Sequence, residues 1–272
     1  MDHRQKDNPD AGFAALKALR ALPRPVYGHA AGLPNHAIGQ RHSHPWVQLS
    51  YAVEGLLQVT TAAGRYAAPP LFAVWIPAGM PHAVRCASNT EIRSLYIASA
   101  MLPAQGAACR VLVVTPLLRE LVRAFGELPV EYDEGGPEGR LVAVLLDQLA
   151  AAREIGLTLP WPADRRLRKV CVYLHKNPEC RKGLYDFSTQ LGVSEKTVSR
   201  LFLQETGLTF RLWRQRSRLL ASLPLLEQGM RVTDVALSCG YESMSAFTAA
   251  FREQMGATPR ALFSGREEAG PE

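Results

Sequence analysis

The chain has 272 residues, of which 47% are hydrophobic and 21% are charged. This length suits about two domains of ordinary size, and this composition excludes a wholly disordered or fibrous protein. The first eleven residues are polar and lack the apolar core of a signal peptide, and the most apolar stretch, 141–152, contains Asp147 and Gln148. We therefore expect neither export nor a membrane span, and we expect a cytoplasmic protein whose five widely spaced cysteines are reduced thiols.

The net charge of +6 is concentrated in the C-terminal part of the chain. Residues 1–160 hold 14 Lys and Arg against 13 Asp and Glu, whereas residues 161–272 hold 17 against 12. Within the second part, residues 165–218 hold 13 basic and 4 acidic side chains. Such a density of positive charge suits a polyanionic partner, provided that the fold presents the charge on one surface.

The first 98 residues predict a short helix followed by antiparallel strands. The helix is expected near Phe13–Leu22, before a proline-rich entry. Residues 48–98 are rich in Val, Leu, Ile, Tyr and Thr, and their runs are broken by Gly55, Ala63-Gly64, Pro69-Pro70 and Pro77-Ala-Gly79. Short apolar runs separated by turn residues at this spacing are typical of a β-barrel or sandwich.

Two helices are predicted after the strands, over Pro116–Phe125 and Glu138–Arg153. The apolar face expected for the second helix consists of Leu141, Val144, Leu145, Leu149 and Ala152. A face of this kind packs either on the β unit of its own chain or on a second copy of the chain. Both alternatives stay open at this point, and the second would make the helix a dimer interface.

The sequence Leu159-Pro-Trp-Pro-Ala cannot continue a helix, and it predicts a linker over residues 159–164. The linker separates an N-terminal domain, 1–158, from a C-terminal domain, 165–263, which a tail of residues 264–272 follows. Asp164 is a natural N-cap for the first helix of the C-terminal domain. A short helix over Leu184–Leu191, a turn at Gly192 and a helix that starts after Ser194 then predict a helix-turn-helix.

This unit is repeated. Ser194, Phe202, Gly207 and Thr209 recur at an offset of 49 residues as Ser243, Phe251, Gly256 and Thr258. Between the two copies, residues 209–223 have the signals of a basic helix, and Pro224 is expected to end or kink it. The C-terminal domain is therefore expected to hold two similar helix-turn-helix units joined by one helix.

The C-terminal domain resembles that of the AraC/XylS family of bacterial transcription regulators. The resemblance lies in LYDFSTQLGVSEKTVSRLF at 184–202, GYESMSAFTAAFR at 240–252 and GATP at 256–259. It implies two recognition helices that enter successive major grooves of promoter DNA about one helical turn apart. Met244 and Ala249 cannot form bidentate hydrogen bonds with bases, so the second helix is expected to give methyl and phosphate contacts. The expected DNA contacts are Ser194, Lys196, Thr197, Ser199, Arg200, Arg214, Arg216, Arg218, Ser243, Met244, Ser245, Ala249 and Arg252.

Residues 39–82 resemble the cupin barrel found at the front of many such regulators. The resemblance lies in HSHPWVQ at 42–48, Glu54-Gly55 and WIPAGMPH at 75–82. Strand alternation is expected to place His42 and His44 on one face, with His82 opposite them on a later strand. Three imidazoles and the oxygen of Gln48 would bind one divalent transition metal.

Gln48 stands where metal-binding cupins usually have Glu. A neutral amide is a weaker ligand than a carboxylate, so a second interpretation stays open. In that interpretation the histidines and Gln48 line a polar pocket for a small organic effector, with Trp46 and Trp75 as its walls.

The expected fold class is α+β: an N-terminal cupin-like antiparallel β-barrel with flanking helices, and a C-terminal all-α domain with two helix-turn-helix units. The expected function is a transcription regulator whose barrel senses a small molecule or a metal and whose C-terminal domain binds promoter DNA. RNA polymerase and a second copy of the chain are expected as further partners, a membrane is not, and activation and repression stay open. The alternative is a metal-dependent cupin enzyme, dioxygenase-like, that uses His42, His44 and His82. It leaves the second domain unexplained, so we expect no catalytic residues.

Overall fold

The computed structural model describes residue 16 and residues 18–28, 39–86, 90–102, 106–156 and 158–263. Contacts divide the chain into two compact units: unit 1 comprises Met1–Thr61 and Ala68–Ile155, and unit 2 comprises Ala62–Ala67 and Gly156–Glu272. Of the helix expected near Phe13–Leu22, Leu16 and Ala18 are helical, and residues 13–15 and 17 lie outside the described residues. The tail at 264–272 also lies outside them. No helix in the described part of the chain is long and apolar enough to cross a membrane.

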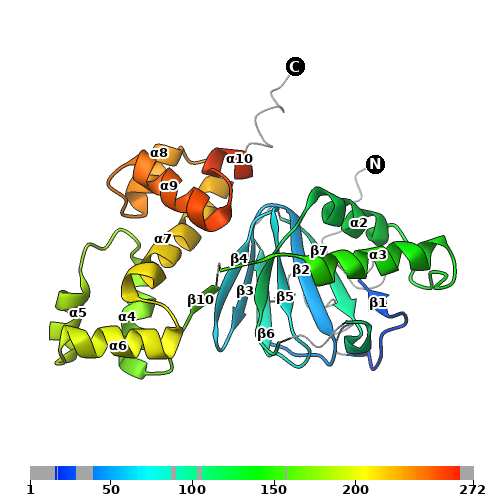
Figure 1. The fold of residues 1–272 in the computed structure, drawn as a ribbon, viewed down its shortest axis with the longest axis horizontal. Helices are drawn as coiled ribbons and strands as arrows, with labels where there is room; N and C mark the ends of the chain where they lie inside the picture. Colours follow the sequence, from blue (N-terminus) through cyan, green and yellow to red (C-terminus); the bar gives the residue numbers. More distant parts are fainter. Residues whose placement is uncertain are drawn as a thin grey trace, which may run out of the picture. The chain divides into compact units, whose positions relative to one another are not determined.

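Unit 1 is built on antiparallel sheets, as the runs of β-branched and aromatic residues predict (Figure 1). One sheet has six strands in the order β1-β7-β2-β5-β8-β9. Its strands are β1 (Val26–Tyr27), β2 (Val47–Glu54), β5 (Phe72–Ile76), β7 (Glu91–Ile97), β8 (Arg110–Val113) and β9 (Glu154–Ile155). In addition, β3 (Leu57–Thr61) pairs antiparallel with β6 (His82–Cys86).

Two helices, α2 (Pro116–Gly126) and α3 (Pro137–Ala151), pack on the six-stranded sheet (Figure 1). A short 3₁₀ helix, η1 (Ser99–Met101), follows β7. The face of α3 that is buried differs from the predicted one. It consists of Val142, Leu145, Leu146 and Leu149, which follow the i, i+3, i+4, i+7 spacing. Val144, predicted to share the apolar face with Leu145 and Leu149, is 44% exposed, because the buried stripe is turned by about one residue from the predicted one.

In unit 2, a strand occupies part of the expected linker. The strand β10 (Thr158–Pro160) pairs antiparallel with β4 (Gly64–Ala68), and Leu159 is fully buried. The proline at position 160 is compatible with this pairing because a proline at a strand end need not donate to the ladder. Beyond it, Asp164 caps the next helix through its carboxylate, as predicted.

The remainder of unit 2 is helical, which confirms the predicted combination of antiparallel sheet and helical domain. The helices are α4 (Arg165–Lys176), α5 (Leu184–Leu191), α6 (Glu195–Thr206), α7 (Phe210–Glu227), α8 (Val232–Ser238), α9 (Met244–Met255) and α10 (Pro259–Phe263). The pairs α5–α6 and α8–α9 lie toward opposite ends of α7 (Figure 1).

The four repeated residues have the same physical roles in both copies. Ser194 and Ser243 cap α6 and α9, and Phe202 and Phe251 are fully buried. Gly207 and Gly256 end the two helices with φ of 69° and 76°, a conformation that glycine adopts without strain. Thr209 and Thr258 each accept a hydrogen bond from the backbone at the start of the following helix.

Helix α7 does not end at Pro224. It continues to Glu227, and the carbonyl of Pro224 accepts a hydrogen bond from the N–H of Gln228. A proline removes only its own N–H donor, so a last turn whose other donors are satisfied can form around it. Pro224 therefore lies inside the connecting helix, one turn before its end.

Candidate functional site

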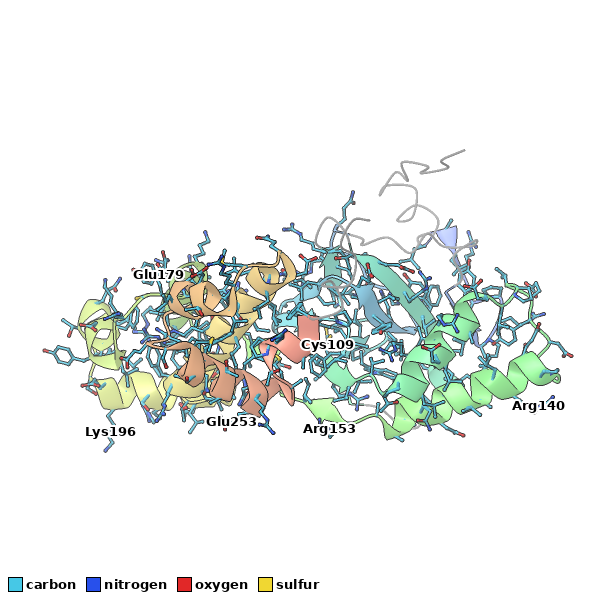
Figure 2. All side chains as sticks on the ribbon, turned by 90° about the horizontal axis from the view of Figure 1, so that it is seen from above. Cys109, Arg140, Arg153, Glu179, Lys196 and Glu253 are labelled. Carbon is cyan, nitrogen blue, oxygen red and sulfur yellow. The ribbon has the colours of Figure 1, made fainter. Side chains whose placement is uncertain are left out.

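Helix α6 presents a polar and basic surface to solvent. Lys196, Ser199 and Arg200 are exposed, and Figure 2 shows the Lys196 side chain extending away from the ribbon. The Ser194 hydroxyl accepts from the Thr197 N–H at 3.2 Å and lies 2.9 Å from the Thr197 hydroxyl. Ser194 and Thr197 therefore stabilise the start of this helix, whereas the other three side chains extend outward.

The exposed surface of α9 is less polar. Met244, Ser245, Ala249 and Arg252 are exposed, and Met244 retains 47% of its accessible area. The Ser243 hydroxyl caps the helix by accepting from the Ala246 N–H at 3.1 Å. Of these four side chains, one is positively charged, one carries a hydroxyl and two are apolar, so this set is less polar than the one on α6.

Three of the four arginines of α7 bond to backbone carbonyls of unit 2. Arg214 donates to the carbonyls of Lys182 and Cys180, and Arg218 donates to those of Pro178 and Cys180. Arg216 donates to the Thr158 carbonyl at 3.4 Å. Burial lowers the pKa values of Arg214 and Arg216, although both stay charged. Each of these guanidiniums thus bonds to the main chain, and the phosphate contacts expected from the sequence stay a prediction.

In unit 1, the three predicted histidines lie together. His42 pairs with His82 in an isolated β-bridge, and His44 lies in the segment that enters β2. The ring centroids of His42 and His82 are 4.3 Å apart, those of His44 and His82 are 5.2 Å apart, and one ring nitrogen from each of the three lies within 4.8 Å of the others. His44 and His82 are buried and His42 is partly buried. The predicted cluster therefore forms, although His42 and His44 lie outside a regular strand.

The surroundings of the three imidazoles favour their neutral forms. Burial lowers the pKa of all three, and it lowers that of His82 to about 3, with repulsion from the other two rings as a further cause. Each Nδ1 contacts a backbone carbonyl: that of Gln40 at 2.9 Å, that of Trp46 at 2.9 Å and that of Met80 at 2.7 Å. A carbonyl only accepts, so Nδ1 carries the proton and Nε2 presents its lone pair.

Gln48 brings an oxygen to the same point. Its Oε1 lies 2.9 Å from His44 Nε2 and 3.0 Å from His82 Nε2. Its amide nitrogen donates to the Ser50 hydroxyl at 2.8 Å, with the Ser94 hydroxyl at 3.5 Å, and the two serines face each other across β2 and β7. A neutral imidazole has one N–H, yet both nitrogens of His44 and of His82 face oxygen atoms. The four residues therefore converge as acceptors.

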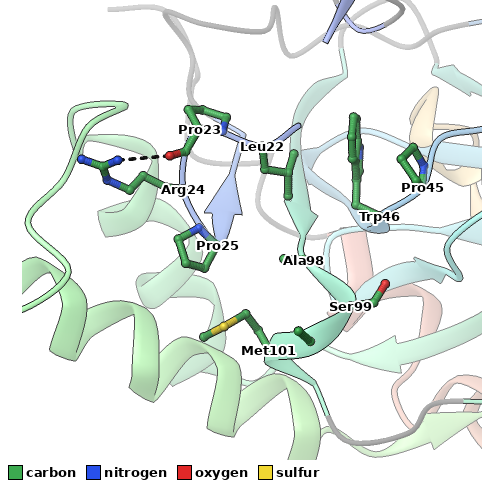
Figure 3. A pocket seen from close by; sticks show the side chains of 10 residues that line it. Leu22, Pro23, Arg24, Pro25, Pro45, Trp46, Ala98, Ser99 and Met101 are labelled. Carbon is green, nitrogen blue, oxygen red and sulfur yellow. Dashed lines mark hydrogen bonds between the residues drawn. The ribbon is translucent and has the colours of Figure 1, made fainter. Parts of the chain in front are cut away.

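Trp46 and Trp75 occupy different environments. The Trp46 ring stacks on His44 with an interplanar angle of 11° and lines a cavity of about 480 Å³ (Figure 3). The walls of this cavity also include Leu22, Pro25 and Met101. Trp75 is fully buried in the core between the sheet and helices α2 and α3, with Arg110 over its ring. The cavity and the histidine cluster thus share Trp46, and Trp75 does not line the cavity.

One histidine with no role predicted from sequence is part of a second cluster. His175 on α4 has its Nε2 3.0 Å from Arg65 Nη1, and its Nδ1 is 3.4 Å from the Ser217 hydroxyl. Arg65 also lies over the Trp161 ring, and the Trp213 indole donates to the Pro160 carbonyl at 2.7 Å. Trp161, within the predicted linker, was the available sequence signal, but the partner Arg65 is 110 residues from His175.

Comparison with known proteins agrees with both parts of this description. Residues 25–151 match the family model of the AraC-like ligand binding domain, and residues 187–265 match a helix-turn-helix domain. The HTH-type transcriptional regulator NimR of Escherichia coli is 32% identical over 218 residues, which cover 80% of this chain and 80% of that protein.

More distant relatives match over shorter stretches or with lower identity. The arabinose operon regulatory protein of Escherichia coli is 29% identical over 152 residues, covering 53% of this chain and 51% of that protein. A crystal form of ToxT from Vibrio cholerae aligns with 88% of this chain and 96% of that chain, at 12% identity and a TM-score of 0.37.

Proposed function

Because the chain belongs to the AraC family of transcriptional regulators, we propose that α6 and α9 read one promoter site together and that the histidine cluster of unit 1 binds a metal that controls this reading. The proposal places the chain in the cytoplasm and makes it a regulator that acts by binding, without catalysis. Its further partners are RNA polymerase and a second copy of the chain.

The observation that supports DNA reading is the exposed set on α6 and α9. Arg200 is central to it because its guanidinium can bond guanine O6 and N7 together. The proposed contacts are Lys196, Ser199, Arg200, Met244, Ser245, Ala249 and Arg252, with Ser194, Thr197 and Ser243 at the helix starts.

Selection of bound duplexes from a random pool by the purified protein tests this proposal. On the selected duplex, Arg200→Ala should cost about 1–3 kcal/mol and relax the preference at one base pair. Arg216→Ala, which removes the same charge from a side chain bonded to a carbonyl, is the matched control. Equal losses on selected and random DNA would leave Arg200 as a phosphate contact only.

The observation that supports a metal is the convergence of three Nε2 lone pairs and the Oε1 of Gln48. Two ligands ~2.1 Å from one ion and at right angles to each other are about 3.0 Å apart, which matches the 2.9 and 3.0 Å separations between Oε1 and the two Nε2 atoms. The residues present therefore fit a divalent ion. His42, His44, His82 and Gln48 would hold it, and it would cross-link the entry to β2 with the start of β6.

An alternative without metal uses the same residues. With the amide of Gln48 reversed, its N–H groups would donate to His44 and His82, and its oxygen would accept from Ser50 and Ser94. This polar wall would suit an organic effector in the neighbouring cavity that Trp46 lines. Elemental analysis of protein dialysed against Zn²⁺, Ni²⁺, Mn²⁺ or Fe²⁺ separates the two. If the wild-type protein retains one equivalent of an ion and a His42→Ala/His44→Ala variant retains none, the metal site is supported. If the wild-type protein retains none of the four ions, the alternative without metal is favoured.

The proposed dimer also needs a surface. Leu145 and Leu149, which belong to the predicted apolar face, are buried against their own sheet. On α2 and α3 the large apolar side chains that stay exposed are Leu117 and Val144. Sedimentation of the full chain at micromolar concentration, compared with Leu117→Glu/Val144→Glu, tests this surface. A wild-type monomer contradicts the dimer.

A further inference from the structure

A direct link joins the two helix-turn-helix units, in addition to α7. The link is made by the loop 177–183, which leads into α5, and by the turn at Gly240 and Tyr241, which separates α8 from α9. Between them lies the guanidinium of Arg218, from the middle of α7. We call the loop, the turn and Arg218 together the brace.

Arg218 contacts both sides of the brace. Its Nε donates to the Pro178 carbonyl at 2.9 Å and its Nη2 to the Cys180 carbonyl at 3.1 Å. On the other side, its Cζ lies 5.8 Å from the centroid of the Tyr241 ring. One side chain thus donates to two loop carbonyls of the first helix-turn-helix, while its cationic face lies over an aromatic ring of the second helix-turn-helix.

The backbone of the second helix-turn-helix, at Gly240, lies directly against the loop 177–183 of the first helix-turn-helix. A Cβ at position 240 would be 2.8 Å from the Pro178 oxygen, 2.9 Å from the Glu179 Cα and 2.6 Å from Arg218 Nη2. The φ of Gly240 is +75°, so glycine is required here both for its conformation and for this close approach. Glu179, labelled in Figure 2, marks the loop.

The brace spans the weak point of the connecting helix. Pro224 interrupts the hydrogen bonding of α7 between Arg218 and α8, and a helix bends most readily at such a position. Arg218 precedes Pro224 in the chain and Gly240 follows it. A contact between them therefore closes a ring around the proline and opposes bending there.

We propose that Arg218 is a positioning residue that, through the brace, fixes the spacing between the two DNA subsites that the chain reads. Inserting one base pair between two subsites rotates one relative to the other by about 35° and moves it by ~3.4 Å. A rigid pair of readers cannot follow this change, whereas a pair free to bend at Pro224 can follow part of it. This inference rests on the proposed reading of DNA by both α6 and α9.

The test measures affinity for a spacing series. Protection experiments define the two subsites on a duplex selected by the wild-type full-length chain, and duplexes with one base pair inserted or deleted between the subsites are then compared. The affinity of the wild-type protein should fall about tenfold or more with each change in spacing, because one of the two recognition helices can then no longer contact its subsite. Arg218→Ala should bind the original duplex more weakly but lose at most about threefold on the altered ones.

Two further variants and a control isolate the cause. Arg218→Lys keeps the charge but lacks the planar guanidinium that donates from two separate nitrogens to the two carbonyls while it lies over the Tyr241 ring. It should therefore relax the spacing as Arg218→Ala does. Gly240→Ala forces the brace apart from the other side and should act in the same direction. Arg216→Ala removes an equal charge from the same helix outside the brace, and it should retain the wild-type penalty.

The outcomes are distinct. If folded Arg218→Lys and Gly240→Ala proteins keep the full wild-type penalty, the brace does not set the spacing. If the wild-type protein is itself indifferent to spacing, the premise that both helices read DNA fails instead. A penalty relaxed equally by Arg216→Ala would also overturn the proposal, because loss of charge alone would then explain it.

Discussion

His175 shows how a single partly buried side chain depends on its neutral form. Arg65 can only donate, so the His175 Nε2 that faces it must accept, and the Nδ1–H then points to Ser217. A protonated ring would place two cations 3.0 Å apart. Burial, with the charge of Arg65 as a second cause, accordingly lowers the pKa of His175 to about 4.

This pKa predicts a pH-dependent stability. The unfolded chain binds a proton at His175 near pH 6.5, whereas the folded chain does so only near pH 4, so stability is complete above 6.5 and falls as the pH drops between these values. The contribution is at most about 3.4 kcal/mol. Urea unfolding at several pH values, compared with His175→Gln, isolates it from the parallel effect of His82. Identical pH profiles for the two proteins would contradict the prediction.

Ser50 is predicted to set the orientation of the Gln48 amide. Because the amide nitrogen donates to Ser50, Oε1 faces the imidazoles, and Ser50→Ala should lower metal affinity about 10–100-fold. In a Gln48→Glu background both oxygens are equivalent, so the affinity should rise and the serine substitution should matter little. Chelator competition measures all four proteins. Equal losses from Ser50→Ala in the two backgrounds would show that Ser50 does not act through the amide.

At the scale of elements, periodicity and capping residues predicted the helices of unit 2 to within a few residues. The predictions failed where these signals are weak. Strands β9 and β10 have two and three residues, which is too short for an alternation to appear. On α3, two apolar stripes share Leu145 and Leu149, and only packing on the sheet selects the one that includes Val142.

The site was predicted in part for a related reason. The cupin-like motifs and the alternation of side chains along strands predicted that the three histidines and Gln48 lie close together. The partners of long basic side chains could not be predicted, because an arginine reaches a phosphate and a distant carbonyl equally well. Arg214, Arg216 and Arg218 contact carbonyls 32 to 58 residues away in the chain.

The difference between exposed and bonded cations predicts a salt dependence. Each phosphate neutralised contributes about 0.9 to the slope of log affinity against log salt. Neutralising Lys196, Arg200 and Arg252, which are exposed on α6 and α9, should therefore flatten the slope by up to about 2.7. Arg216→Gln should leave it unchanged. Filter binding between ~50 and ~200 mM salt measures the slopes. A flatter slope for Arg216→Gln would show that α7 also contacts DNA phosphates.

For the whole molecule, sensing requires that metal binding by unit 1 and DNA binding by unit 2 are energetically coupled. A ligand shifts an equilibrium only by its differential affinity for the two states, and such coupling is typically about 1–3 kcal/mol. Linkage is reciprocal, so a metal that raises DNA affinity by some factor must itself bind the DNA complex more tightly by the same factor.

The proposed regulator is therefore predicted to change its DNA affinity about 5- to 150-fold when a chelator removes the metal and to recover when the metal returns. The His42→Ala/His44→Ala variant should bind DNA with one affinity under both conditions, because it has lost two of the ligands. Titration of the metal into the free protein and into its DNA complex gives the reciprocal factor, and the two factors must agree. A wild-type protein that binds one metal ion yet keeps the same DNA affinity and promoter response has a structural site there, and its effector must then act elsewhere, with the cavity beside Trp46 as the next place to test.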